Sequence, residues 1–128
     1  MKYIMDHVHD NEILSYQVEL INHSITLHTK YKKEIINICF TGVMAHLFEC
    51  ELPGSIILDV GEYPVSIFIE ENQKLLNERK NHCWPIYYKE IEDLIKILES
   101  ERYVYYIISS SYGLSGWVLA KNVEIKKG

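Results

Sequence analysis

Alternation of apolar and polar residues over two neighbouring segments constrains the fold of this chain more than any other feature. In residues 13–21 the odd positions Ser15, Gln17 and Glu19 are polar, and the residues between them are Leu14, Tyr16, Val18 and Leu20. Asn22 and His23 then precede a second alternating segment, Ser24–Tyr31. Successive side chains of a strand point to opposite faces. The two segments therefore predict an antiparallel hairpin with one buried face.

The rest of the sequence predicts further strands and two helices. Residues 34–48 read as one long strand with a bend or bulge at Gly42, and residues 55–60 as a short apolar strand. Apolar residues recur at helical spacing after Pro64 and again in residues 91–98, and residues 103–109 and 116–125 return to strand patterns. The prediction is an α+β fold in one domain, residues 1–128. About six antiparallel strands follow the order β-β-β-β-α-α-β-β, with two helices packed on one face of the sheet.

Charge and hydropathy narrow the range of partners. The 128 residues carry a formal net charge of −5, and their basic residues are scattered. Direct nucleic-acid binding is not expected, because neutralising phosphates requires a basic face. No apolar run approaches the ~20 residues that span a bilayer, and the acidic and histidine-rich start does not fit a secretory signal. These features predict a cytoplasmic protein that does not bind membranes.

A histidine pair near the start is the only candidate metal site. His7 and His9 would lie on the same side of an extended chain, and Asp10 follows them. Imidazole and carboxylate groups are common ligands of zinc and iron, and His46 is one residue that could complete the set. The alternative is an exposed segment that leads into the first strand. No fixed ligand spacing follows downstream, so no cofactor is expected.

Two further groups of residues are candidates for binding a partner. The first is acidic and includes Glu49, Glu51, Asp59 and Glu62. Such side chains could form a solvated face or a docking surface for a basic protein. The second is the segment between the last two predicted strands, with Ser110, Ser111, Tyr112 and Trp117. Its serines and glycines are typical of turns, and the Gly-x-Ser-x-Gly motif of hydrolases is absent from it.

Several stretches together resemble a family of small, uncharacterised bacterial α+β proteins. They are residues 9–16 (HDNEILSY), 40–49 (FTGVMAHLFE), 56–60 (IILDV), 84–85 (WP) and 108–120 (ISSSYGLSGWVLA). Members of that family are similar to the immunity-type proteins found beside polymorphic toxins. The resemblance implies a small α+β protein with a binding role, and it carries no catalytic motif.

The sequence thus favours a non-enzymatic protein-binding module, in the form of an immunity protein that neutralises a cognate bacterial toxin domain. Two alternatives stay open. One is a small metal- or ligand-binding enzyme that uses His7, His9 and Asp10. The other is a structural domain that forms a homodimer or larger homo-oligomer through an exposed strand edge.

Overall fold

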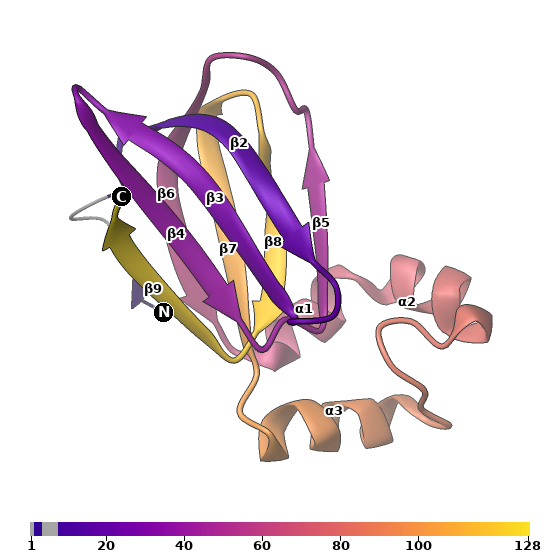
Figure 1. The fold of residues 1–128 in the computed structure, drawn as a ribbon. Coiled ribbons are helices and arrows are strands. Elements are labelled where there is room, and N and C mark those ends of the chain that lie inside the picture. Colours follow the sequence, from indigo (N-terminus) through magenta and orange to yellow (C-terminus); the bar gives the residue numbers. More distant parts are fainter. Residues whose placement is uncertain (1, 4–7) are drawn as a thin grey trace.

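The protein is an α+β fold built on one antiparallel sheet, with its helices grouped beside one end of that sheet (Figure 1). The computed structural model describes residues 2–3 and 8–128. Within them, eight strands follow the order β5-β8-β7-β6-β2-β3-β4-β9, and a short β1 pairs with β6. The strands are β1 (Lys2–Tyr3), β2 (Glu12–Glu19), β3 (Ser24–Tyr31), β4 (Glu34–Thr41), β5 (Ala45–Glu49), β6 (Ser55–Tyr63), β7 (Val104–Tyr112), β8 (Ser115–Ala120) and β9 (Asn122–Lys127). The α+β class and the antiparallel sheet are confirmed.

The predicted number of about six strands is wrong, because two predicted strands each break into two. Residues 34–48 divide into β4 and β5 at Gly42, whose φ of 64° lies in the left-handed region. Residues 116–125 divide into β8 and β9 at Lys121. The two breaks face each other, since the Lys121 amide donates to the Thr41 carbonyl over 3.1 Å. At these two breaks the predicted strands bend. As a result β4 pairs with β9 at one end of the sheet, and β5 pairs with β8 at the other.

This bend curls the sheet around a first hydrophobic core. Alternation along β7 and β8 separates the two faces of these strands: Tyr106, Ile108 and Val118 point into the first core, whereas Tyr105 and Trp117 point into a second. The first core also receives fully buried side chains from β3 and β4, among them Leu27, Ile38 and Phe40. The β2–β3–β4–β9 part therefore packs across the β6–β7–β8 part.

The second core holds the helices against the other face of β5, β7 and β8. The helices are α1 (Val65–Glu71), α2 (Gln73–Arg79), the 3₁₀ turn η1 (Lys80–His82) and α3 (Ile91–Ser100). Phe68 of α1 is fully buried and meets the ring of Trp117 at 5.1 Å between centroids. Leu94 and Leu98 of α3 are buried in the same core. The longest described helix, α3, has ten residues, and none of the described helices has the length and apolar character needed to cross a membrane.

The predicted arrangement of two helices is also wrong, because the first predicted helix is interrupted at Asn72. This buried side chain donates from Nδ2 to the carbonyl of Phe68 over 2.9 Å and to the Tyr105 hydroxyl over 3.3 Å. Asparagine competes well for backbone groups at helix ends, which explains why α1 stops and α2 begins here. Around α3 the prediction agrees with the structure, and Glu90 and Asp93 form a capping box at its start.

Candidate functional site

An open cleft between β2 and β5 is the candidate functional site. Beyond Ile13, β2 pairs only with β3 in the described part of the chain, because β6 pairs with it at Glu12 and Ile13 alone. At the end of the sheet order, β5 pairs with β8 alone among the described strands. Side chains from both strands, and from the segments beside β5, line two hollows. The curled sheet thus leaves two strand edges without backbone partners beside the same cleft.

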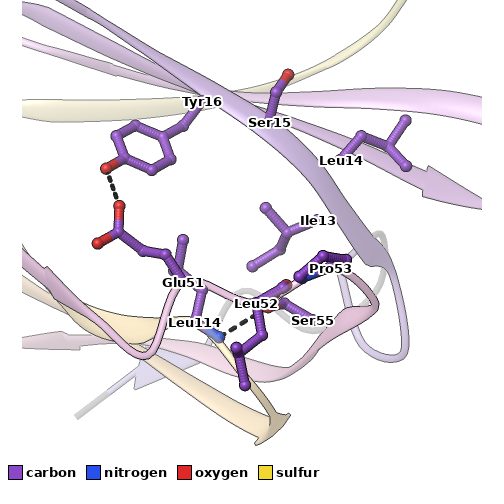
Figure 2. A pocket seen from close by; sticks show the side chains of 9 residues that line it. All are labelled: Ile13, Leu14, Ser15, Tyr16, Glu51, Leu52, Pro53, Ser55 and Leu114. Atoms are coloured by element: carbon purple, nitrogen blue, oxygen red, sulfur yellow. Dashed lines mark hydrogen bonds between the residues drawn. The ribbon is translucent and has the colours of Figure 1, made fainter.

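The first hollow has a cavity volume of about 290 Å³ and mostly apolar walls (Figure 2). Nine residues line it: Ile13, Leu14, Ser15, Tyr16, Glu51, Leu52, Pro53, Ser55 and Leu114. Leu14 and Leu52 are 50% and 49% exposed, which is high for leucine side chains on an ordered scaffold. The Ser55 hydroxyl fixes the wall, since it donates to the Leu52 carbonyl over 2.6 Å and accepts from the Leu114 amide over 2.8 Å.

A β-bulge explains why Leu14 lines the cleft and does not enter the core. The register between β2 and β3 shifts between Ile13 and Ser15. Ile13 is therefore buried on the same side as Tyr16 and Val18, and Leu14 is turned toward solvent. The predicted inward position of Leu14 is wrong, as is that of Leu20, which is 80% exposed in the turn after β2.

Tyr16 and Glu51 join the two walls of the cleft. The Tyr16 hydroxyl donates a hydrogen bond to the Glu51 carboxylate, and the Tyr16 ring packs edge-on against Phe48 with 4.9 Å between centroids. The bond to Glu51 raises the pKa of Tyr16, and burial adds to this effect. Burial lowers the pKa of His46, and the negative charge of Glu51 opposes that shift. The Glu51 carboxylate therefore affects the pKa of both neighbouring titratable side chains, Tyr16 and His46.

Replacing Tyr16 with phenylalanine is expected to lower the free energy of unfolding by about 1 kcal/mol, because the hydrogen bond to Glu51 is lost while the ring stays against Phe48. Tyr16→Ala should cost a further ~1 kcal/mol or more, since the aromatic contact is lost as well. Urea unfolding at pH 7 measures both changes. Equal stability of Tyr16→Phe and Tyr16→Ala would contradict a role for the ring in joining the walls.

The second hollow lies at the other end of β2. Its walls come from Val18, Glu19, Leu20, His23, Ser24, Val43, Met44, Ala45 and His46. Beside it, Leu20 and Ile21 at the tip of the β2–β3 hairpin are 80% and 92% exposed. The His23 carbonyl accepts from the Val43 amide over 2.8 Å, so the hairpin tip is anchored to the segment that leads into β5.

The predicted acidic residues separate into two places. Glu49 ends β5 and lines neither hollow, whereas Glu51, two residues further, lines the first hollow. Asp59 and Glu62 lie on β6, where they pair with Ser109 and Tyr106 of β7. Two strands, β7 and β8, separate β6 from β5 in the sheet. Of the four predicted acidic residues, only Glu51 therefore lines the candidate site.

The predicted serine-rich segment is a tight hairpin between β7 and β8. The hydroxyl of Ser110 donates to the Leu114 carbonyl, and that of Ser111 to the Ile56 carbonyl over 3.5 Å. Tyr112 is 54% exposed at the end of β7, close to the first hollow through Leu114. Trp117 is only 6% exposed and packs with Phe68 in the helix core, so its ring supports the scaffold.

The histidines predicted as metal ligands lie apart in the structure. His7 is outside the described residues. His9 donates from Nδ1 to the Leu58 carbonyl of β6 over 2.8 Å, and its Nε2 lies 3.5 Å from the Asp10 carboxylate. His46 is on β5, which lies three strand positions from β6 in the sheet. Measured across the strands, three spacings are roughly 14 Å. Within residues 2–3 and 8–128, no three His, Cys, Asp or Glu side chains gather as a metal site would require.

Sequence reasoning missed most of the cleft. The alternation predicts Tyr16 on one face of a strand, and the candidate sites predicted from the sequence include neither Leu52 nor Pro53. One signal was available: Ile13 and Leu14 are adjacent apolar residues in an otherwise alternating strand, a pattern that a bulge produces. Comparison of the chain with protein-family models, with curated proteins and with solved structures gives no significant match.

Proposed function

We propose that this protein is a non-enzymatic binding module that captures a partner protein at the cleft between β2 and β5. The observation that carries the proposal is the combination of exposed apolar side chains with carboxylates that form no salt bridge between described residues. Leu14 and Leu52 flank the first hollow, and Glu51 lies between its walls. Burial of exposed apolar side chains favours association, and a rim of one charge sign favours a partner of the opposite sign.

The charges of the cleft favour a basic partner. Its two hollows are lined by the carboxylates of Glu19 and Glu51 and by no lysine or arginine. None of the salt bridges between described residues includes Glu19, Glu49 or Glu51. A partner that brings lysine or arginine here would neutralise carboxylates that the chain itself leaves without a cation.

The partner we propose is a bacterial toxin domain, which makes this chain its immunity protein. The resemblance of residues 9–16, 40–49 and 108–120 to immunity-type proteins supports this choice. All three stretches contribute to the cleft or its support: Ile13 and Tyr16 come from the first, Phe48 from the second and Leu114 from the third. The toxin to test is the product of the gene next to the one that encodes this chain.

Reversing the charge of Glu51 should weaken the complex with that toxin domain at least tenfold, because a lysine at position 51 would repel the basic partner. Glu99→Lys provides the matched control: it makes the same charge change on an exposed residue of α3, in the helix layer. Titration calorimetry measures both affinities, and survival of cells that express the toxin measures protection.

Two results would overturn the proposal. The first is the absence of any complex together with the absence of protection by the unchanged protein. The second is a complex that Glu51→Lys and Glu99→Lys weaken equally, because the interface would then lie away from the cleft.

A further inference from the structure

We propose that the partner contributes an extended strand of about six residues, with alternating basic side chains, that pairs with the outer edge of β2. This inference rests on the proposed function and specifies how the partner is bound. In this mode, backbone hydrogen bonds to the strand edge supply affinity, and the side chains of the added strand supply specificity.

The edge of β2 meets the main requirement for strand addition. Between Ser15 and Glu19 the strand is held by β3 on one side, with regular pairing from Ser15 opposite His28 to Glu19 opposite Ser24. On its other side no described strand pairs with it, because β6 leaves β2 after Ile13. The side chains of Ser15 and Gln17 are exposed and uncharged, so they neither cover this edge nor repel an incoming chain.

The length of the added strand follows from the positions of the exposed apolar side chains. Leu14 and Leu52 lie at the start of β2, and Leu20 and Ile21 lie just past its end. The six steps of extended chain from Leu14 to Leu20 cover about 20 Å. A partner strand of this length reaches both apolar ends at once, which explains why such side chains are exposed at each end of the same edge.

Charge distinguishes this edge from the outer edge of β9, the strand that ends the sheet beyond β4. Glu51 lies beside the start of β2, and Glu19 at its end accepts only from neutral groups, including Ser24 over 3.1 Å. The last residues of β9 are Lys126 and Lys127. Edge lysines discourage pairing with another strand, and they repel a basic one in particular. A basic strand is therefore directed to β2.

Binding of three blocked heptapeptides to the full chain tests the inference. The first alternates valine and lysine, the second alternates valine and glutamate, and the third alternates proline and lysine. The third has the charge of the first, but its prolines lack the N–H groups that a ladder needs. Nuclear magnetic resonance titration with ¹⁵N-labelled protein measures the affinities and locates the affected amides. We expect the valine–lysine peptide to bind at least tenfold more tightly than either control, with the largest shifts in β2.

Variants of the protein give a second, independent measurement. The double variant Ser15→Lys/Gln17→Lys places two cations beside the edge and should weaken the valine–lysine peptide at least tenfold. Ser66→Lys/Asn77→Lys adds the same charge to exposed positions of α1 and α2 and should leave binding unchanged.

Each contrary outcome has a distinct meaning. Equal binding of the proline–lysine peptide, or shifts confined to another strand, would overturn strand addition at β2. Equal binding of the valine–glutamate peptide would overturn the requirement for a basic strand. If none of the three peptides binds, the inference of strand addition is overturned as a whole. None of these results bears on whether the protein binds a toxin domain through Glu51. The calorimetric experiment tests that proposal separately.

Discussion

Gly116→Ala is expected to destabilise the protein by about 3 kcal/mol or more, because a side chain at this position has no space. Gly116 lies in β8 with a φ of 154°, between Phe48 of β5 and Ile108 of β7. A Cβ atom there would lie 1.9 Å from the carbonyl oxygen of Leu47, a backbone atom that moves only with its strand. The substitution must therefore push β5 away from β8 or distort both strands.

Gly54→Ala is the matched control for this experiment. Gly54 has a φ of 83°, but a Cβ atom there would meet no other atom within 4 Å. Its cost should be the left-handed backbone penalty alone, about 1–2 kcal/mol. Urea unfolding of both variants at pH 7 measures the difference. Equal destabilisation would mean that backbone conformation, and not the close approach of β5, makes glycine necessary at position 116.

This result also bears on the candidate site, because β5 forms one wall of the cleft. Phe48 pairs with Gly116 across the ladder and contacts the Tyr16 ring from the opposite wall. If β5 moves, Tyr16 loses that contact. A Gly116→Ala protein that remains folded should therefore bind the toxin domain more weakly than Gly54→Ala does.

Raising the pH from 10 to 12 is expected to remove several kcal/mol of stability through two buried tyrosines. Burial raises the pKa of Tyr105 and of Tyr106 to about 12, and each side chain is 3% exposed. In the unfolded chain tyrosine titrates near 10. Between these values the unfolded chain releases protons that the folded chain retains, so stability falls as the pH rises. The difference in pKa corresponds to about 2–3 kcal/mol for each residue.

Tyr106→Phe isolates one of these contributions. The phenylalanine ring can keep the edge-on contact with Phe40, whose centroid lies 5.3 Å from that of Tyr106. The variant should therefore lose less stability between pH 10 and pH 12 than the unchanged protein does. Tyr112→Phe, at a side chain that is 54% exposed, is the control. Denaturant unfolding at a series of pH values measures how steeply the free energy of unfolding falls with pH in each variant. If this fall is as steep in Tyr106→Phe as in the unchanged protein, Tyr106 does not contribute to it.

Several parts of the structure could be predicted because they depend on residues close together in the chain. The β2–β3 hairpin follows from alternation on both sides of Asn22 and His23, and its turn falls at residues 20–23. The helix α3 follows from apolar residues at helical spacing in residues 91–98. In each case local sequence determines which backbone conformation lets apolar side chains reach one face.

Other features depended on contacts between distant segments. The sequence indicates a bend or bulge at Gly42, but it does not show that the strand ends there or that a second break falls at Lys121. The two breaks face each other because Thr41 and Lys121 meet across the ladder. Likewise, Asn72 ends α1 through a bond to Tyr105, 33 residues away.

The sequence by itself determined the α+β class, the antiparallel pairing and the acidic character of the protein, because periodicity and charge are properties of the chain. Only the tertiary structure decided where a partner could bind. The bulge that exposes Leu14, the departure of β6 that leaves the edge of β2 unpaired, and the approach of Glu51 to Tyr16 all arise when the sheet curls. The physical reason is that a cleft forms where strands separate, and their separation depends on how distant segments pack.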